Sequence, residues 1–322
     1  MKKPFSWYGG KGALAPFLVS LLPLHQVYCE VFGGSGALLF AKEPSDLEVF
    51  NDLDSGVVNF FRVLRNPQQA AELQRLLTLT PYAREEYYDC LIQWEEAPDP
   101  VEKARQWYVG VMQSMNSSIR NTGWSTTKAP GSNPARAWVN TIASLTTYAD
   151  RLAHVEIDHR DFEAVIHTYD SPVTCFYLDP PYLAETRRKG RCYHQEMGRE
   201  DHERLLSCIL QVQGMVILSG YAHPLYQEAE ALASWESIKL NTRCSSAVRA
   251  HAAQHEVSPE VWTRTECIWM NPACVQHQRS LFHALQGNDR TSVDSEISQD
   301  GEEQQETSHH TSLSVEALSW AS

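Results

Sequence analysis

The sequence lacks the cysteine patterns of a metal centre or a disulfide framework. Its eight cysteines include no CxxC pair and no cysteine and histidine cluster with zinc-ligand spacing. Several stand inside apolar runs such as VYCEVF and TCFYLDP, where cysteine behaves as a small buried hydrophobe. Among the thirteen histidines, His251 and His255 alone form an HxxxH pair, and no acid pattern accompanies them. We therefore expect reduced thiols and no bound metal.

Long hydrophobic runs are also missing. The apolar stretch 13–24 is broken by Pro16 and Pro23 and is shorter than the ~20 residues that span a bilayer. The opening Met-Lys-Lys is followed by Pro, Ser, Trp and Gly, which is unlike the apolar segment of a secretory signal. We expect a soluble cytoplasmic protein with no membrane partner.

Basic residues are in deficit, with 27 lysines and arginines against 40 acids and a net charge of −13. Such a balance argues against a nucleic-acid partner. However, residues 287–322 hold eight acids and one arginine, so that this stretch alone carries −7. The remaining chain can still present a locally basic face. Residues 286–322 are rich in Ser, Gln, Glu, Asp and Thr, and we expect a disordered acidic tail there.

Strand and helix patterns alternate in the first 66 residues. The apolar segments 27–32 and 47–52 predict strands, and helical patterns cover 13–22, 36–43 and 55–66. This order is typical of a parallel βαβ unit.

Strand patterns return after residue 150. They cover 154–159, 174–179, 215–221, 236–242 and 266–272, with helical patterns at 199–213 and 224–233. Seven strands with helices between most of them predict an α/β fold. We expect a doubly wound, mostly parallel seven-stranded sheet built from residues 1–66 and 151–285.

The intervening residues 67–150 have a different character. Helical patterns cover 68–79, 83–94, 101–115 and 135–152. A polar stretch rich in Gly, Ser, Thr and Asn, residues 114–134, is too long for a simple connector, and such segments are often functional. We expect an inserted helical subdomain.

Two glycine-rich segments follow the pattern of a ligand site. WYGGKG at residues 7–12 combines an aromatic ring, glycines and Lys11, and EVFGGSG at residues 30–36 ends the first strand pattern. Asp52 ends the next strand, where an acid can accept both hydroxyls of a ribose. Because there is no GxGxxG spacing and no phosphate-binding lysine, a nucleoside without phosphates fits best.

The third segment, Asp179-Pro180-Pro181-Tyr182, directly follows the apolar strand pattern TCFYL. Two consecutive prolines fix an extended backbone at the end of a buried strand, where α/β sheets bind ligands. An amino group can donate hydrogen bonds to the Asp179 carboxylate and the Pro180 carbonyl, while Tyr182 stacks on the attached ring.

In that order, WYGGKG, EVFGGSG, NDLD and DPPY resemble the Dam-type adenine-specific DNA methyltransferases, which use S-adenosyl-L-methionine. The resemblance covers most of residues 4–272, since HRDF, DHERLL, VILSGY and CIWMNP also fall where that family has them.

The resemblance implies roles for individual residues. The catalytic set would be Asp179, Pro180, Pro181 and Tyr182. The set that contacts S-adenosyl-L-methionine would be Trp7, Lys11, Glu30, Phe32, Gly33, Gly34, Ser35, Gly36, Asp52, Asp161, Phe162 and Asp179. Hydrogen bonds to Asp179 and Pro180 would make adenine N6 more nucleophilic, and the adenine would flip out of double-stranded DNA to reach them.

DNA contacts are expected from two places. Family order puts target recognition in the insert 67–150, where the candidates are Arg120, Asn121, Trp124, Lys128 and Arg136. The basic run just past DPPY supplies Arg187, Arg188, Lys189 and Arg191 for phosphates near the flipped base. The insert does not match the recognition hairpin of GATC-specific members, so the target sequence stays open.

Other interpretations remain at this point. The same fold methylates cytosine N4, RNA adenine or protein glutamine in relatives, although Asp179 favours adenine. A non-catalytic DNA-binding protein that kept the fold is a second alternative, against which the intact DPPY, Lys11 and Asp52 argue. A nucleotide-dependent oxidoreductase is the most distant, because the chain has no GxGxxG.

Overall fold

The computed structural model describes residues 1–115, 117, 119, 123–127, 132–187, 194–226, 234–243 and 263–278. One compact unit comprises Met1–Leu281. The acidic segment 286–322 lies outside the described residues.

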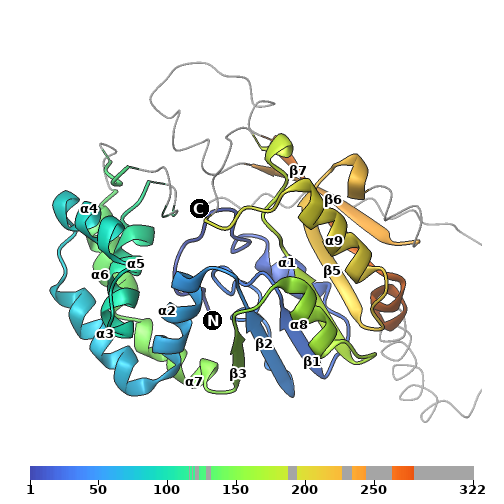
Figure 1. The fold of residues 1–322 in the computed structure, drawn as a ribbon, viewed down its shortest axis with the longest axis horizontal. Helices are drawn as coiled ribbons and strands as arrows, with labels where there is room; N and C mark the ends of the chain where they lie inside the picture. The colour runs from blue at the N-terminus through green and yellow to red at the C-terminus, as the bar shows by residue number, and fades with distance from the viewer. Residues whose placement is uncertain are drawn as a thin grey trace, which may run out of the picture. The chain divides into compact units, whose positions relative to one another are not determined.

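A seven-stranded sheet with the order β3-β2-β1-β4-β5-β7-β6 forms the centre of this unit (Figure 1). The strands are β1 (Val27–Glu30), β2 (Leu47–Asn51), β3 (Val155–Asp158), β4 (Thr174–Leu178), β5 (Met215–Tyr221), β6 (Glu236–Arg243) and β7 (Thr263–Met270). Strands β1 to β5 run parallel, and β7 is antiparallel to both β5 and β6. The predicted α/β fold with a mostly parallel sheet is confirmed.

The order of the strands positions the three sequence motifs. Strand β1 lies between β2 and β4, with Cys29 paired to both Val49 and Phe176. Carboxyl ends of parallel strands meet at one edge of the sheet, and the chain order reverses between β1 and β4. The glycine loop after β1, Asp52 after β2 and Asp179 after β4 therefore meet at this edge.

Successive side chains of β4 enter two apolar clusters, as the period of two along a strand requires. Cys175 and Tyr177 belong to one cluster, whereas Phe176 and Leu178 belong to the other. Helices α1 (Ala15–Ser20) and α2 (Ser55–Arg65) contribute to the first cluster, and α8 (Phe162–Tyr169) and α9 (Arg199–Ile209) to the second. Helices thus cover both faces of the sheet, with α8 and α9 on the face toward the viewer in Figure 1.

The predicted insert is helical and gathers beside α2, at the left of Figure 1. Its helices are α3 (Pro67–Leu79), α4 (Arg84–Gln93), α5 (Pro100–Met112), α6 (Pro134–Ile142), η1 (Leu145–Thr147) and α7 (Tyr148–Leu152). Proline at the first helical position and an Asn or Asp cap begin three of them, where Asn66, Asp99 and Asn133 each accept a backbone N–H. Trp107 of α5 packs against α2 at Gly56, where a Cβ would lie 2.1 Å from the indole.

Some predicted helices differ in the structure. The predicted helix 36–43 is absent: residues 36–41 form consecutive turns, where the Leu39 N–H donates to the Glu30 carboxylate and Gly36 has φ +63°. The segment 135–152 divides into α6, η1 and α7, and helix α8 was not expected. Of the predicted helix 224–233, residues 224–226 are described and are helical.

Membrane-spanning helices and clusters of metal ligands are both absent from the part of the chain that the structure describes. There, no helix is long and apolar enough to cross a membrane. No group of three or more His, Cys, Asp and Glu could hold a metal ion in the same residues. Six cysteines are described and all of them are buried, namely Cys29, Cys90, Cys175, Cys208, Cys267 and Cys274.

Candidate active site

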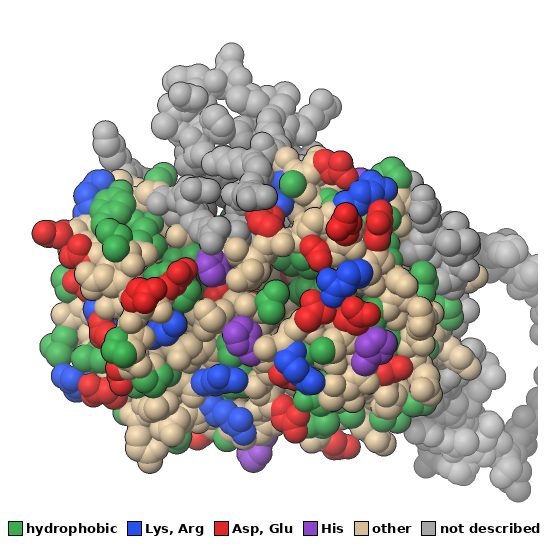
Figure 2. Space-filling model, viewed as in Figure 1, with side chains coloured by type: hydrophobic (Ala, Val, Ile, Leu, Met, Phe, Trp, Pro, Cys, Tyr) green, Lys and Arg blue, Asp and Glu red, His purple; other side chains and the backbone are tan. Residues whose placement is uncertain are grey.

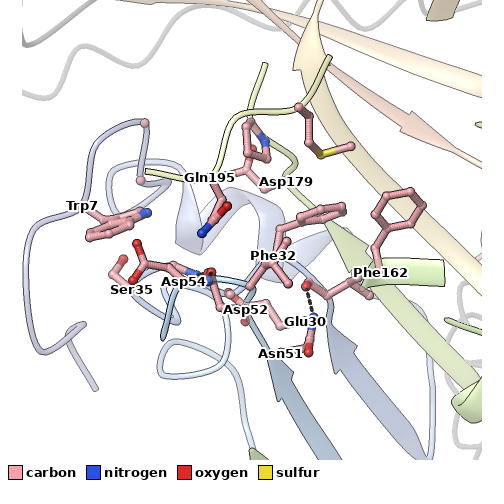
Figure 3. A pocket seen from close by; sticks show the side chains of 18 of the residues that line it. Trp7, Glu30, Phe32, Ser35, Asn51, Asp52, Asp54, Phe162, Asp179 and Gln195 are labelled. Atoms are coloured by element: carbon pink, nitrogen blue, oxygen red, sulfur yellow. Dashed lines mark hydrogen bonds between the residues drawn. The ribbon is translucent and has the colours of Figure 1, made fainter. Parts of the chain in front are cut away.

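A pocket opens at the carboxyl edge of β1, β2 and β4, where the N-terminal loop, the glycine loop and the DPPY segment meet (Figure 3). It is lined by all the residues expected to contact the cofactor except Gly36: Trp7, Lys11, Glu30, Phe32, Gly33, Gly34, Ser35, Asp52, Asp161, Phe162 and Asp179. In Figure 3, Trp7 and Phe162 lie at opposite ends, with Glu30 and Asp52 between them. The structure thus brings together segments that are far apart in the sequence.

The glycines of the loop after β1 make room for aromatic rings. A Cβ at Gly33 would lie 2.1 Å from the Phe50 ring, and one at Gly34 would lie 2.7 Å from the Trp7 indole. Gly34 also has φ +49°, a left-handed conformation that favours glycine. Close packing of the protein on itself therefore requires these glycines. Through Gly34, Trp7 is held at its place in the pocket wall.

Asp52 braces the glycine loop with its carboxylate. Oδ2 accepts the Gly34 N–H at 2.7 Å, and Oδ1 accepts the Asp54 N–H at 2.8 Å. Burial, followed by the neighbouring charge of Asp54, raises the pKa of Asp52 to about 7. Each carboxylate oxygen has a further lone pair, so hydroxyl groups can still donate to Asp52.

Glu30 is a second, more deeply buried carboxylate in the pocket wall. Its Oε2 accepts the Tyr28 hydroxyl at 3.0 Å and the Leu39 N–H at 2.9 Å. Burial raises the pKa of Glu30 to about 8, although both hydrogen bonds oppose the shift. Protonation of these two acids makes the pocket less negative. A cationic or hydroxyl-bearing ligand would favour their ionised forms.

The opposite end of the pocket is aromatic. Phe32 and Phe162 lie with ring centroids 5.8 Å apart and an interplanar angle of 36°. Asp161 caps helix α8 by accepting the Glu163 N–H at 3.0 Å, and it pairs with Arg204 at 2.8 Å. These contacts fix the HRDF segment at the edge of the pocket.

Lys11 and Asp179 form an ion pair at the edge of the pocket. Nζ of Lys11 donates to Oδ1 of Asp179 at 2.7 Å and to Oδ2 at 2.9 Å. The Lys11 side chain is 7% exposed and that of Asp179 is 17% exposed, so the carboxylate remains reachable beside a buried ammonium. The carboxylate that pairs with Lys11 is the acid of DPPY.

Tyr182 is packed more tightly than its proposed stacking role suggests. The residue is 6% exposed, the Lys11 ammonium lies 4.7 Å from its ring centroid, and Tyr221 meets the ring edge-on at 4.6 Å. Its hydroxyl donates to Glu266 of β7. Pro181 lines the pocket, whereas Tyr182 lies behind it.

A buried histidine supports the DPPY turn from helix α9. Nε2 of His202 lies 3.0 Å from the Pro181 carbonyl oxygen, and Nδ1 contacts the Tyr226 hydroxyl. Burial lowers the pKa of His202 to about 4, so the ring is neutral at ordinary pH. A neutral ring donates from one nitrogen and accepts at the other, which matches these two partners.

Three of the candidates for DNA contact are among the described residues, namely Trp124, Arg136 and Arg187. The Trp124 indole N–H donates to Gln113 at 3.2 Å, and the ring packs on Tyr82, which anchors it to the insert. Arg187 is paired with Glu196 and its side chain is 4% exposed. The other candidates, Arg120, Asn121, Lys128, Arg188, Lys189 and Arg191, lie outside the described residues. On the face in Figure 2, basic and acidic side chains are interspersed.

Sequence reasoning missed several residues of the site. The amide of Asn51 donates to the Val31 and Arg160 carbonyls and so ties β1 to the HRDF segment. The segment 194–197 lines the pocket although no motif marks it, and His194 lies 3.2 Å from the carboxylate of Asp54. Glu266 carried a signal, because it is the single acid that begins the otherwise apolar pattern ECIWM.

Comparisons with known proteins place this site in a family. A profile of the D12 class N6 adenine-specific DNA methyltransferases matches residues 7–239. The Type II methyltransferase M1.LlaDCHI of Lactococcus lactis subsp. cremoris is 30% identical over 250 residues, which cover 70% of this chain and 84% of that protein. A crystal structure of precorrin 8w decarboxylase from Methanobacterium thermoautotrophicum aligns over 84% of this chain and 98% of its own, at 9% identity and a TM-score of 0.34, too low to support any conclusion. The profile match and the similarity to the Lactococcus relative agree with the resemblance that the DPPY motif suggests, and the chain belongs to the D12 class of N6 adenine-specific DNA methyltransferases.

Proposed function

We propose that the protein transfers a methyl group from S-adenosyl-L-methionine to N6 of an adenine that has left the stack of double-stranded DNA. The observation that carries this proposal is the ion pair of Lys11 and Asp179 at the edge of a pocket that also holds Glu30 and Asp52. Asp179, our candidate for binding adenine, lies at the wall of the pocket that we propose for the methyl donor. Direct transfer requires that methyl donor and methyl acceptor lie next to one another.

The donor set of the pocket suits this cofactor. S-adenosyl-L-methionine supplies a methyl group that is already activated as a sulfonium. Asp52 can accept the two ribose hydroxyls, and Glu30 can accept the cationic amino group once it is ionised. Phe32, Phe162 and Trp7 offer apolar faces for a flat base. Ser35 and the loop around it supply short polar groups between these two regions.

Asp179 and Pro180 act on the acceptor. The lone pair of adenine N6 is delocalised into the ring, so the free amine is a poor nucleophile. A carboxylate and a carbonyl that accept both N–H groups favour a pyramidal nitrogen and stabilise the positive charge that develops on it. Lys11 occupies one lone pair of each Asp179 oxygen and thereby fixes the carboxylate plane, which leaves further lone pairs for N6.

The adenine must leave the duplex to reach Asp179. We therefore propose base flipping and a separate surface of the protein that binds the rest of the DNA. The insert 67–150 stands beside the sheet and is our candidate for target recognition. Residues 188–191 follow the reaction centre closely in sequence and are our candidates for phosphate contacts, whereas Arg187 is buried and paired with Glu196. Because the Tyr182 ring is enclosed by Lys11 and Tyr221, stacking of the flipped base on it requires that these neighbours move.

The test is a product analysis. The protein is incubated with isotope-labelled S-adenosyl-L-methionine and, separately, with double-stranded DNA, single-stranded DNA and RNA, and the nucleosides are separated after digestion. We expect label in N6-methyladenine from double-stranded DNA. Label in N4-methylcytosine or in RNA adenine would assign a different acceptor, and no label in any nucleoside would contradict the proposal.

A further inference from the structure

The buried acid Glu266 has no part in the chemistry described so far, yet it lies against the reaction centre. Its side chain is 6% exposed, and its Oε1 lies 3.3 Å from Nζ of Lys11. The same oxygen accepts the Tyr182 hydroxyl. Glu266 therefore contacts both the lysine that holds Asp179 and the aromatic residue of DPPY.

The antiparallel strand explains how an acid far along the chain arrives there. In a parallel strand, the carboxyl end lies at the edge that carries the site. Strand β7 runs in the opposite direction, so its first half lies at that edge, with Glu266 paired to Tyr221, the last residue of β5. The Tyr221 ring in turn meets the Tyr182 ring edge-on, at an interplanar angle of 69°.

The burial of Glu266 has an energetic cost that its contacts must offset. A carboxylate removed from water is destabilising unless it is paired and hydrogen-bonded, and burial raises the pKa of Glu266 accordingly. Well-packed apolar residues often replace buried ion pairs without loss of stability. Stability alone thus gives no reason for a glutamate at this position, whereas the placement of its two partners does.

We propose that Glu266 is a positioning residue for methyl transfer, an inference that rests on the proposed function. Lys11 has a flexible four-carbon stem, and its ammonium is held between the Asp179 and Glu266 carboxylates. With both acids present, the ammonium has one position and the Asp179 carboxylate one orientation. The hydrogen bond from Tyr182 fixes the DPPY ring to the same acid. Glu266 thus sets the geometry of the acid that receives N6.

Glu266→Gln tests this positioning role, because it keeps the size and one acceptor oxygen but removes the negative charge, so that the neutral amide attracts the Lys11 ammonium less strongly. A displacement of about 1 Å at a reacting group lowers rates by up to ~10²-fold. We expect the single-turnover rate of methyl transfer to fall by about 10- to 100-fold. The dissociation constant for S-adenosyl-L-methionine should stay within about twofold, because Glu266 does not line the pocket.

The matched control is Glu156→Gln on β3. Glu156 also accepts a tyrosine hydroxyl, that of Tyr169 at 2.9 Å, but it is exposed and lies on the edge strand away from the site. We expect wild-type rates from this variant. In a cycle with Tyr182→Phe, the double variant should lose less rate than the product of the single losses, because Tyr182→Phe removes the hydrogen bond whose charged acceptor Glu266→Gln replaces with a neutral one.

The outcomes separate this inference from the proposed function. If wild-type protein methylates adenine and a folded Glu266→Gln protein does so at the same rate, or loses rate only in proportion to cofactor affinity, the positioning role is contradicted. If Glu266→Gln does not fold, Tyr182→Phe decides, and a wild-type rate from it contradicts the inference. Failure of the wild-type protein to methylate DNA contradicts the proposed function itself.

Discussion

At the scale of single residues, the pocket is distinguished by two carboxyl groups that burial holds partly protonated. Glu30 and Asp52 lie on neighbouring strand ends, and their pKa values are raised to about 8 and about 7. Neither faces an ammonium or guanidinium group in the contacts described, unlike Asp179 with Lys11. We propose these two acids as the partners of the cationic and hydroxyl groups of the cofactor.

Asp52→Ala is expected to weaken S-adenosyl-L-methionine binding by about tenfold or more, since a hydrogen bond to a charged group contributes ~1.5–3 kcal/mol. Calorimetry on the purified variant gives the affinity. The variant also removes the acceptor of the Gly34 N–H, so circular dichroism must show an intact fold. An unchanged affinity in a folded variant would move the ribose contact to another residue.

The raised pKa values predict a pH dependence with a defined sign. Between the ordinary values of 4.5 and 3.8 and the raised values of about 8 and about 7, the folded protein holds protons that the unfolded chain has lost. These two groups therefore make the free protein less stable as pH rises through this window. Cofactor binding that needs the ionised acids should strengthen over the upper part of the same window, from pH 6 to 8.

Denaturant unfolding of the free protein and calorimetric titration with cofactor, both at several pH values, measure the two slopes. Asp52→Asn should reduce both slopes, because it removes one of the two titrating groups. Cofactor affinity that falls steadily from pH 6 to 8 would show that Glu30 and Asp52 do not bind the cofactor in their ionised forms.

At the scale of elements, the carboxyl ends of the strands bring the site residues together, and His202 of helix α9 contacts the DPPY turn. The β-rich segments and the acid or glycine that ends each of them were readable from the sequence, because buried parallel strands are continuous apolar runs. The turns that replace the predicted helix 36–43 could not be predicted from the sequence. Their Leu39 N–H bonds to Glu30, a tertiary contact that overrides a helical pattern. Likewise, no sequence pattern predicts that residues 194–197 line the pocket.

His202→Phe tests the support of the DPPY turn from helix α9. The change leaves the Pro181 carbonyl and the Tyr226 hydroxyl without this partner, and a buried polar group left unsatisfied is destabilising by ~1–3 kcal/mol. We expect a lower free energy of unfolding and a lower turnover with nearly unchanged cofactor affinity. Tyr226→Phe, which keeps the bond from His202 to Pro181, should lose less turnover. Equal turnover in His202→Phe and wild type would show that the turn is held by its prolines alone.

At the scale of the whole molecule, charge is distributed unevenly along the sequence. The net charge of −13 includes −7 from residues 287–322, so the remainder is only mildly acidic. DNA is a strongly anionic partner, and an acidic segment repels it wherever it lies within the range of screening. The acidic balance that first argued against a DNA partner is thus largely a property of one segment.

Deletion of residues 287–322 is expected to leave methyl transfer intact and to tighten non-specific DNA binding at low salt, because the deleted segment carries −7. Fluorescence anisotropy with labelled duplex at two salt concentrations measures the binding, and the product analysis measures transfer. A folded truncated protein without activity would assign these residues a direct role in catalysis or substrate binding.

The proposed methyl transfer depends on Asp179, whose carboxylate would accept a hydrogen bond from the adenine amino group. One measurement tests this role most directly. Label transfer from S-adenosyl-L-methionine to DNA adenine is compared between wild type and Asp179→Ala, with folding and DNA affinity measured in parallel. Loss of one preorganised electrostatic partner lowers turnover by ~10²–10³-fold. We expect transfer by Asp179→Ala to fall at least that far while the protein stays folded and still binds DNA, with severe loss in Asp179→Asn as well. A folded Asp179→Ala protein that methylates adenine at nearly the wild-type rate would contradict the account.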